Sequence, residues 1–588
     1  MLTTSDMPEF DTLIRGGTVV DGTGAPRVQA DVAVRGGKVA AVGHFPAHAA
    51  GRVIDAGGLV VAPGAIDLHT HYDAQVHWDP YCTIASWHGV TTVTVGNCGF
   101  GLAPVRPEDA DRAMLALSRN EAIPLASMKA AVPFSWETFG QWMDHLDALP
   151  KGINLSHLAP VSPIFAHAMG GFDAAKGRSP TGPERARILS LLAEALDAGA
   201  IGWGAQRHVP GSLVSIQRDH DGSGMISDLA PDEIYLELAR ALRGRRGAFI
   251  QFSQGTTTAE NFMAELRGDF EFSARLAEIA GCPVLYNAIM ALNSGPEIFR
   301  EQLTWVDEAN RAGIPVFAQT ASVRSPAVLT LEDWNLFDAS DAWRQATLGS
   351  VEDRVRKLSA PATRAALRAD YDAGGLGTGF FGELALYRLH GSTLPDFRSF
   401  VGETIRDIAA RLGRHPIDAM LDLSVAENLR TEWISPPIND DPDKTRALFD
   451  SPFTVPGTSD GGAHVKFLTA GTYPTDFLSW LVRDTGRLTL EEAHRRLSGL
   501  PAQIAGLSGR GRIAPGFAAD LVVYDLAELG EGPVEKLHDL PAGEWRRVRR
   551  ARGYRSILVS GEPIFVEGNC TGATPGRLLR HGVDPVAG

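Results

Sequence analysis

Two histidines separated by one residue, His69 and His71, are the part of the sequence with the clearest chemical meaning. They end the string Pro-Gly-Ala-Ile-Asp-Leu-His-Thr-His at residues 63–71, which has the apolar character of a buried strand. Side chains two residues apart on a strand point to the same side, so both imidazoles are expected to face one site. Imidazole is a common neutral ligand of transition metals, and two of them supply half of a tetrahedral site. The alternative is a pair of incidental histidines at a solvated strand end.

A cysteine and an aspartate follow other predicted strands in glycine-rich strings. Cys98 lies in Gly-Asn-Cys-Gly at residues 96–99, and Asp460 lies in Gly-Thr-Ser-Asp-Gly-Gly at residues 457–462. A thiolate can bind a metal because the cation lowers its pKa, and a carboxylate can bind a metal and accept a proton from its water. The alternatives are a buried structural thiol and a turn in which Asp460 caps a helix.

These residues require a scaffold that brings several strand ends together. Between the termini, short apolar strands alternate with amphipathic helices, which is the pattern of a parallel α/β sheet. Eight such units in a row predict a (β/α)8 TIM-like barrel, whose catalytic residues collect at the carboxyl ends of the strands. The predicted strands cover residues 65–71, 90–96, 153–158, 200–205, 247–252, 283–287, 315–320 and 453–460.

Both ends of the chain have short alternating apolar runs broken by glycines. This period-two pattern is typical of antiparallel strands, and we expect the two ends to form one small β-sandwich. The sandwich would take residues 1–62 and 509–588, and the barrel would take residues 63–508. The stretch between the last two barrel strands is too long for one crossover, so an inserted, mostly helical subdomain is expected at about residues 322–399.

The composition limits the partners and the environment. The 588 residues contain 55 Lys and Arg against 70 Asp and Glu, and a formal charge of −15 repels polyanions. We therefore expect a small-molecule substrate and neither nucleic acid nor a membrane as partner, although residues 544–555 form a basic run. Four cysteines exclude a disulfide framework, and the first residues lack a signal-peptide pattern, so a cytoplasmic protein is expected. A homo-oligomer is compatible with these features.

The combined strings resemble the amidohydrolase superfamily and, within it, the D-aminoacylase (N-acyl-D-amino-acid deacylase) family. The resemblance rests on the histidine string, on the strings around Cys98 and Asp460, and on Gly-Arg-Gly-Arg-Ile-Ala-Pro-Gly-Phe-Ala-Ala-Asp at residues 509–520. It implies that His69 and His71 are paired metal ligands and that Cys98 is a metal-binding cysteine. It also implies that Asp460 binds the metal and acts as general base in the hydrolysis of an amide bond.

The sequence departs from this family at two expected ligands. The family pattern places a histidine at the end of strand five and another at the end of strand six, where Phe252 and Asn287 are expected here. No histidine occurs between His220 and His390. A binuclear site is therefore not expected, and one divalent metal, most simply one Zn2+ per chain, would be held by a smaller set of ligands.

Other residues are candidates for contacts with a substrate. Arg207 and His208 follow strand four, and the Arg207 guanidinium has the geometry to bind a carboxylate through two hydrogen bonds. Asn287 is a further candidate at the end of strand six. The loop after Asp460 carries His464, for which a role in stabilising that loop is the simpler interpretation. Ser459 also fits a Gly-x-Ser-x-Gly string, although a serine-hydrolase elbow belongs on a different fold.

Three hypotheses of function follow. The first is metal-dependent hydrolysis of an amide bond in a small, carboxylated molecule such as an N-acyl amino acid. A second is the opening of a cyclic amide, imide or lactone by the same chemistry. The third is a barrel without catalysis that has lost part of its metal site, which the absent histidines favour and the retained Asp460 opposes.

Overall fold

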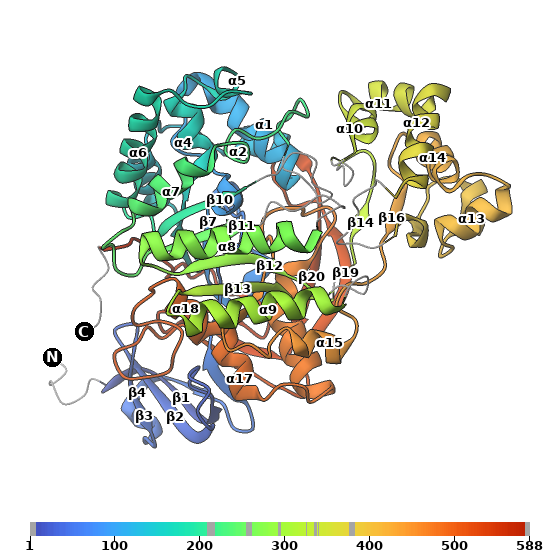
Figure 1. Cartoon of the computed structure of the whole chain (residues 1–588). Helices are drawn as coiled ribbons and strands as arrows, with labels where there is room; N and C mark the ends of the chain where they lie inside the picture. The colour runs from blue at the N-terminus through green and yellow to red at the C-terminus, as the bar shows by residue number, and fades with distance from the viewer. Residues whose placement is uncertain are drawn as a thin grey trace.

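Parallel strands lie at the centre of the molecule in the computed structural model (Figure 1), and their pairings arrange them as a ring. The structure describes residues 8–207, 218–253, 262–291, 296–324, 326–333, 338, 340–374 and 383–582. Within these ranges each strand of the ring pairs in parallel with the strand that follows it in the chain. Two sheets share the ring, because only Leu158 separates two strands that belong to different sheets. The strands are β6 (Ala65–Asp67), β7 (Val90–Val95), β8 (Asn154–His157) with its continuation β9 (Ala159–Pro160), β10 (Gly202–Gln206), β11 (Phe249–Ser253), β12 (Val284–Ile289), β13 (Val316–Ala321) and β17 (Thr454–Gly457).

The last strand of the ring meets the first just beyond their carboxyl ends. A parallel bridge joins Thr70 to Gly461, and the backbone N–H of His71 donates to the Gly461 carbonyl at 2.7 Å. Apolar side chains from five of the strands, from residues flanking two others and from the helix over residues 500–504 form one buried cluster below this closure: Ile66, Leu158, Ile201, Phe249, Leu285, Phe317, Val455 and Leu500. The polar residues at the carboxyl ends of the strands therefore lie next to a buried apolar cluster.

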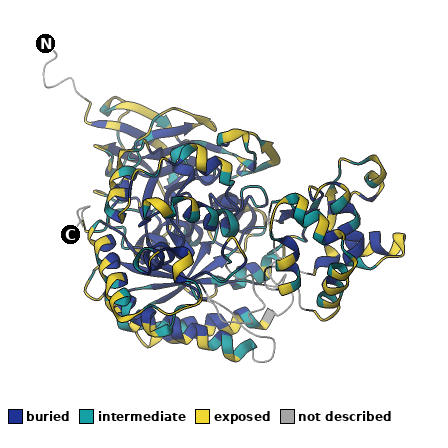
Figure 2. Ribbon diagram, turned by 90° about the horizontal axis from the view of Figure 1, so that it is seen from above, coloured by how far each residue is buried: buried dark blue, intermediate teal, exposed yellow. Residues whose placement is uncertain are grey.

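Helices cover the outer face of the ring, and their ends carry the signals that the sequence predicts. Thr181 and Glu184 form a capping box at the start of one helix, and Gly199 has a φ of +106° just after its end. Figure 2 shows buried residues concentrated in the central strands and exposed residues on the outer sides of the helices. The helices around the ring are α1 (Ala110–Glu121), α2 (Leu125–Ala131), α3 (Phe139–Ala148), α4 (Val161–Ala168), α5 (Phe172–Ala175), α6 (Gly182–Asp197), α7 (Asp232–Arg240), α8 (Phe262–Ala280), α9 (Pro296–Arg311), α15 (Pro442–Ala447), α16 (Tyr473–Asp476), α17 (Leu490–His494) and α18 (Leu500–Ile504).

Strands from the two ends of the chain pair in one nine-stranded sheet. The joint is an antiparallel pair in which Val61 faces Val523 and Ala62 faces Val522. The N-terminal strands are β1 (Phe10–Val19), β2 (Val28–Arg35), β3 (Lys38–Gly43), β4 (Ala50–Asp55) and β5 (Val60–Pro63), and the C-terminal strands are β18 (Leu521–Tyr524), β21 (Tyr554–Val559), β22 (Glu562–Val566) and β23 (Asn569–Cys570). The two termini thus share one sheet, whereas the division into a two-layer sandwich stays a prediction.

Two smaller pairings complete the C-terminal part. The basic run forms most of β20 (Arg546–Arg552), which pairs with β19 (Gly530–Leu537), and the short β24 (Leu578–Leu579) adds to β8. Among the described residues, no helix is long and apolar enough to cross a membrane.

The segment between β13 and β17 forms a unit with a core of its own, which stands to one side of the ring (Figure 1). This core runs from Leu329 to Trp433, so it extends beyond the expected limit at residue 399. The added part is α13 and α14, whose apolar faces pack into the same cluster. Its elements are β14 (Val328–Leu329), α10 (Asp341–Thr347), α11 (Val351–Ser359), α12 (Pro361–Asp372), β15 (Arg388–Gly391), α13 (Ile405–Leu412), α14 (Pro416–Ala426) and β16 (Glu432–Ile434).

Candidate metal centre

His69 and His71 lie just after β6, at the carboxyl end of the ring of strands. Both side chains are 1% exposed, and the Asp67 carboxylate accepts a hydrogen bond from the His69 backbone N–H at 3.1 Å. Burial lowers the pKa of His69 to about 4, and burial together with His69 and His464 lowers the pKa of His71 well below its usual range. Both imidazoles are therefore neutral at physiological pH, which is the form that binds a metal.

Asp460 reaches both histidines from the loop after β17. Its Oδ1 lies 3.3 Å from His69 Nε2 and 3.9 Å from His71 Nε2. The side chain is 26% exposed, so it also faces the open end of the ring. Burial, and secondarily the Asp67 carboxyl, raise the pKa of Asp460 to about 7 in the absence of a cation. A carboxyl group with a pKa in this range can exchange a proton near neutral pH.

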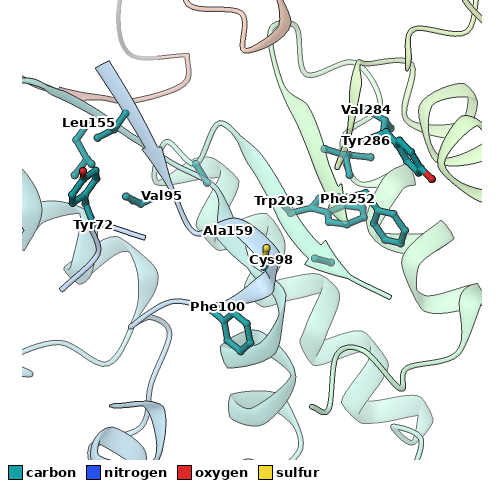
Figure 3. Packing of buried hydrophobic residues seen from close by; sticks show 14 of the residues in the cluster. Tyr72, Val95, Cys98, Phe100, Leu155, Ala159, Trp203, Phe252, Val284 and Tyr286 are labelled. Atoms are coloured by element: carbon teal, nitrogen blue, oxygen red, sulfur yellow. The ribbon is translucent and has the colours of Figure 1, made fainter. Parts of the chain in front are cut away.

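Cys98 lies in the turn after β7, among the buried residues of Figure 3, and approaches His69. Its Sγ lies 3.3 Å from His69 Nε2, and its backbone N–H donates to the side chain of Gln251 at 2.8 Å. The donor atoms of His69, His71 and Cys98 all lie within 4.8 Å of one another. Burial, followed by the charges of Glu121 and Asp460, raises the pKa of the thiol well above its usual value. That Cys98 binds a metal stays a prediction.

The assignment of Phe252 to the ligand position at the end of strand five is wrong. The Phe252 side chain packs outside the ring of strands. The centroid of its aromatic group lies 5.8 Å from those of Tyr235 and Phe272, and Figure 3 shows it next to Trp203. Successive side chains of a strand point to opposite faces, so the next residue, Ser253, is the one that turns inward. Its Oγ lies 3.5 Å from Cys98 Sγ. A serine hydroxyl is not among the usual zinc ligands, so no histidine, cysteine or carboxylate ligand stands at the end of strand five.

Asn287 does face the site, at the carboxyl end of β12. Its Nδ2 lies 3.0 Å from His69 Nδ1, and its Oδ1 accepts a hydrogen bond from the Thr458 hydroxyl at 2.9 Å. The amide thus contacts the imidazole ring on the side away from Asp460. Its predicted contact with substrate stays a prediction, since both amide groups already have partners in the protein.

Glu121 is a residue of this site that the sequence analysis did not single out. It is the last residue of α1, 5% exposed, and its Oε2 lies 3.5 Å from His71 Nε2 and 3.6 Å from His464 Nε2. Burial, and then the charges of Asp460 and Asp73, raise its pKa well above the usual range. In the sequence its helix has an ordinary amphipathic pattern. Glu121 is identified as a residue of the site only by its contact with His464, which lies more than 300 residues later in the chain.

The remaining predicted residues differ in where they lie. Arg207 follows β10, and its guanidinium pairs with Asp232 and Asp269 at 3.0 Å and covers the ring of Phe272. Its charge is therefore already balanced within the chain, and its role in binding substrate stays a prediction. His208 lies outside the described residues.

The residues of the last loop are held in place by the protein. The backbone N–H of His464 donates to the carbonyl of Glu121 at 2.6 Å, which supports the simpler interpretation of this histidine. The Ser459 hydroxyl donates to the His69 carbonyl at 3.3 Å and accepts from the Gly461 N–H at 3.0 Å. These backbone contacts orient the loop and do not resemble the pairing of a nucleophilic serine with a histidine.

Buried carboxyl groups surround the histidines. Asp67 and Asp73 are at most 1% exposed, and burial raises the pKa of each to about 7. With Glu121 and Asp460 they form a group of four acids to which no lysine or arginine of the described residues is paired. Such a group is costly to ionise unless a cation shares the site.

Imidazole and carboxylate donors gathered at the carboxyl ends of parallel strands define a class of protein, the metal-dependent hydrolases. The sequence profile of the amidohydrolase family matches residues 52–565, so the chain belongs to the amidohydrolase family. This membership makes it a metal-dependent hydrolase of carbon–nitrogen bonds, and the predicted resemblance to D-aminoacylases is confirmed.

Individual proteins give the same result. D-aminoacylase from Alcaligenes xylosoxydans xylosoxydans is 27% identical over 578 residues, covering 98% of this chain and 98% of that protein. A solved structure of D-aminoacylase with a binuclear metal centre, in which one metal activates and the second attenuates, superposes with a TM-score of 0.65 at 24% identity. N-acyl-D-glutamate deacylase from Bordetella bronchiseptica, solved with zinc and a phosphonate inhibitor, gives a TM-score of 0.64 at 24% identity. Each match covers 97% of this chain and 100% of the solved one, so the chain shares the overall fold of these amidohydrolases.

Proposed function

We propose that this protein hydrolyses the amide bond of a small N-acyl amino acid, with Asp460 as general base. The observation that carries the proposal is the position of Asp460 Oδ1, which lies 3.3 Å from His69 Nε2 and 3.9 Å from His71 Nε2. The deacylase relatives act on N-acyl-D-amino acids, and this supports the same class of substrate here.

The residues fit one divalent ion, and we propose zinc. Two neutral imidazoles and one carboxylate are a ligand set of catalytic zinc sites, and three protein ligands leave a position for water. Asn287 contacts the second nitrogen of the His69 ring, as a partner that fixes a metal-binding imidazole does. Ser253 and Asn287 stand near Cys98 where the family pattern has histidines, and this supports one ion per chain and not two.

The chemistry requires a nucleophile, a polarised carbonyl and a proton carrier. When bound, a divalent ion makes water more acidic and withdraws electron density from the substrate carbonyl. Asp460 is oriented to accept the proton of that water, because its carboxylate is fixed beside both imidazoles and faces the open end of the ring. The same carboxyl group would then deliver the proton to the leaving nitrogen.

The carboxylate of such a substrate needs a cation or N–H groups in the pocket. Arg207 is proposed for this role, although Asp232 and Asp269 now hold its guanidinium at 3.0 Å. A substrate would therefore compete with these two carboxylates for the same N–H groups. His208 follows Arg207 in the chain and is proposed to contribute to the same contact.

The decisive experiment combines elemental analysis with an activity assay on wild type and Asp460→Asn. We expect one tightly held zinc in the wild type and hydrolysis of at least one N-acyl-D-amino acid in a panel. Asp460→Asn should lower kcat by about a thousandfold or more, because the amide cannot accept the proton. Asp450→Asn is the matched control, since Asp450 is 67% exposed and pairs only with Arg446 among the described residues.

The outcomes separate the parts of the proposal. Wild type that holds no metal, and whose thermal midpoint does not respond to added zinc, would contradict the metal site. Metal-loaded wild type that leaves every N-acyl-D-amino acid intact would contradict the substrate class and leave the site standing.

We also propose the division of the chain into a barrel of residues 63–508 and a β-sandwich of residues 1–62 and 509–588. A cytoplasmic location and the formation of homo-oligomers remain predictions from the sequence. That Cys98 is a metal ligand remains a prediction as well.

A further inference from the structure

The Glu121 carboxylate lies beside the His71 imidazole in the same way that the Asp460 carboxylate lies beside the His69 imidazole. In each pair a carboxylate oxygen faces the Nε2 atom of a buried histidine, at 3.5 Å for Glu121 and 3.3 Å for Asp460. Both carboxylates come from segments beyond the strand ends, one from the end of α1 and one from the loop after β17. The two halves of the site therefore have the same chemistry.

These separations suit atoms that share a metal ion. Bonds of 2.0–2.2 Å at tetrahedral angles place two ligand atoms about 3.3–3.6 Å apart. The pairs His69–Asp460 and His71–Glu121 have 3.3 and 3.5 Å between their nearest N and O atoms. A hydrogen bond between these atoms would be shorter, at about 2.7–3.2 Å.

The contacts of Glu121 differ from those of Cys98. The Glu121 carboxylate is buried, faces the imidazoles of His71 and His464, and has no ion pair with a lysine or arginine of the described residues. The Cys98 sulfur faces one imidazole, that of His69 at 3.3 Å, and the Ser253 hydroxyl at 3.5 Å. A buried carboxylate is costly to hold in its ionised form unless a cation shares the site.

We propose that Glu121 is a ligand of the metal ion, in the place that the sequence predicted for Cys98. This inference rests on the proposed metal site of His69, His71 and Asp460, to which Glu121 adds a second carboxylate. Two imidazoles and two carboxylates neutralise a divalent ion and leave a fifth position for water, which zinc accepts in catalytic sites. His464 is a positioning residue that holds the Glu121 carboxylate through its imidazole and its backbone N–H.

The test is zinc affinity, measured by competition with a chromophoric chelator on the full-length protein. We expect Glu121→Gln to weaken zinc binding by about a hundredfold or more, because loss of a partner that only orients a ligand already costs about 10–100-fold. Cys98→Ser should weaken it at least tenfold less than Glu121→Gln does. Glu108→Gln is the matched control, because Glu108 lies near the same helix with its side chain 65% exposed.

A second measurement on unmodified protein does not depend on how the variants fold. Wild type loaded with Co2+ in place of zinc should lack the near-ultraviolet band of a thiolate bound to cobalt. A strong thiolate band, or a Cys98→Ser variant that loses more affinity than Glu121→Gln, would overturn the inference.

The failure of this inference is distinguishable from failure of the proposed function. If Asp460→Asn and His69→Ala release zinc while Glu121→Gln binds it as wild type does, only the role of Glu121 is wrong. If wild type itself binds neither Zn2+ nor Co2+, both proposals are wrong.

Discussion

At the scale of single residues, Asn287 determines which nitrogen of His69 is free for a metal. In the structure Nδ2 of the amide faces His69 Nδ1 at 3.0 Å, so the neutral imidazole carries its proton on Nε2. A metal at Nε2 requires the proton on Nδ1, and the amide must then present its oxygen. Thr458 can follow this rotation, because its hydroxyl can donate to the amide oxygen or accept from the amide nitrogen. We therefore expect the amide of Asn287 to rotate when the ion binds.

Replacing Asn287 by leucine removes this partner at nearly constant volume. We expect Asn287→Leu to weaken zinc binding by about 10–100-fold, as loss of a partner that orients a metal-binding imidazole does. The measurement is the same chelator competition that tests Glu121. Thr458→Val, which removes only the partner of the amide, should have a smaller effect, and equal affinities for wild type and Asn287→Leu would contradict the argument.

The backbone of the site also departs from ordinary conformations. Cys98, Thr458, Asp460 and His464 have φ angles between 47° and 54°, a region that residues other than glycine rarely adopt. Such conformations cost about 1–3 kcal/mol each and persist only where the surroundings fix them. Here the contacts of the last loop with His71 and Glu121 supply that support.

The sequence predicted the site residues that belong to short recognisable motifs, and it missed the residue that only tertiary packing brings to the site. His69, His71 and Asp460 follow strands whose ends must meet in a barrel, so their proximity could be predicted. Glu121 could not, because its position depends on how α1 packs. At strand five the predicted residue was one position from the inward one, and a shift of one residue exchanges the two faces of a strand.

At the scale of elements, ion pairs connect the inserted unit to segments next to the candidate metal centre. Arg119, two residues before Glu121, pairs with Asp338 of the insertion at 2.5 Å. Lys466, two residues after His464, pairs with Asp333 at 2.9 Å. The two segments that hold the Glu121 carboxylate are thus each connected to the insertion.

The Arg119–Asp338 pair is largely buried, with side chains 15% and 11% exposed. Removing one partner of such a pair leaves a poorly compensated charge, so we expect Arg119→Met to lower the free energy of unfolding by about 2 kcal/mol. Arg356→Met is the control, since Arg356 is 75% exposed and its pair with Asp353 is worth less than about 1 kcal/mol. Urea denaturation followed by circular dichroism measures both, and equal losses would show that burial of the pair does not matter.

The pattern of the sequence predicted the elements better than it predicted their grouping. Period-two strands at both ends and the helix over residues 182–197 follow from local signals. The extent of the insertion does not, because α13 and α14 resemble the helices of the ring. They belong to the insertion because Ile405, Ile408 and Ile417 pack into its core, which is a tertiary property.

At the scale of the whole molecule, three arginines of the basic run are neutralised by acids of the same chain. Arg546 pairs with Asp539, Arg547 with Glu432 and Arg549 with Glu531. The run therefore contributes to contacts within the chain despite the acidic overall charge. Its strand β20 also contacts the ring, since the Arg549 carbonyl lies 2.9 Å from His88 Nε2.

His88 is buried at this junction between the ring and the C-terminal strands. Its Nε2–H donates to the Arg549 carbonyl, its Nδ1 lies 2.7 Å from the Thr475 hydroxyl, and burial lowers its pKa to about 4. The unfolded chain has a histidine pKa of about 6.5, so it binds the proton first as the pH falls. The stability that neutral His88 contributes is therefore complete above pH 6.5 and declines as the pH falls toward 4.

This linkage predicts a difference between variants in their response to acid. Between pH 7.5 and pH 5 the wild type should lose about 2 kcal/mol of unfolding free energy through His88, and His88→Gln should lack that component. The buried carboxyl groups titrate in both proteins, so the difference between their urea midpoints at the two pH values isolates the histidine. His48→Gln, at an exposed position, is the control that should keep the wild-type response. Parallel midpoints for wild type and His88→Gln would mean that the junction opens to water and accepts the proton without loss of structure.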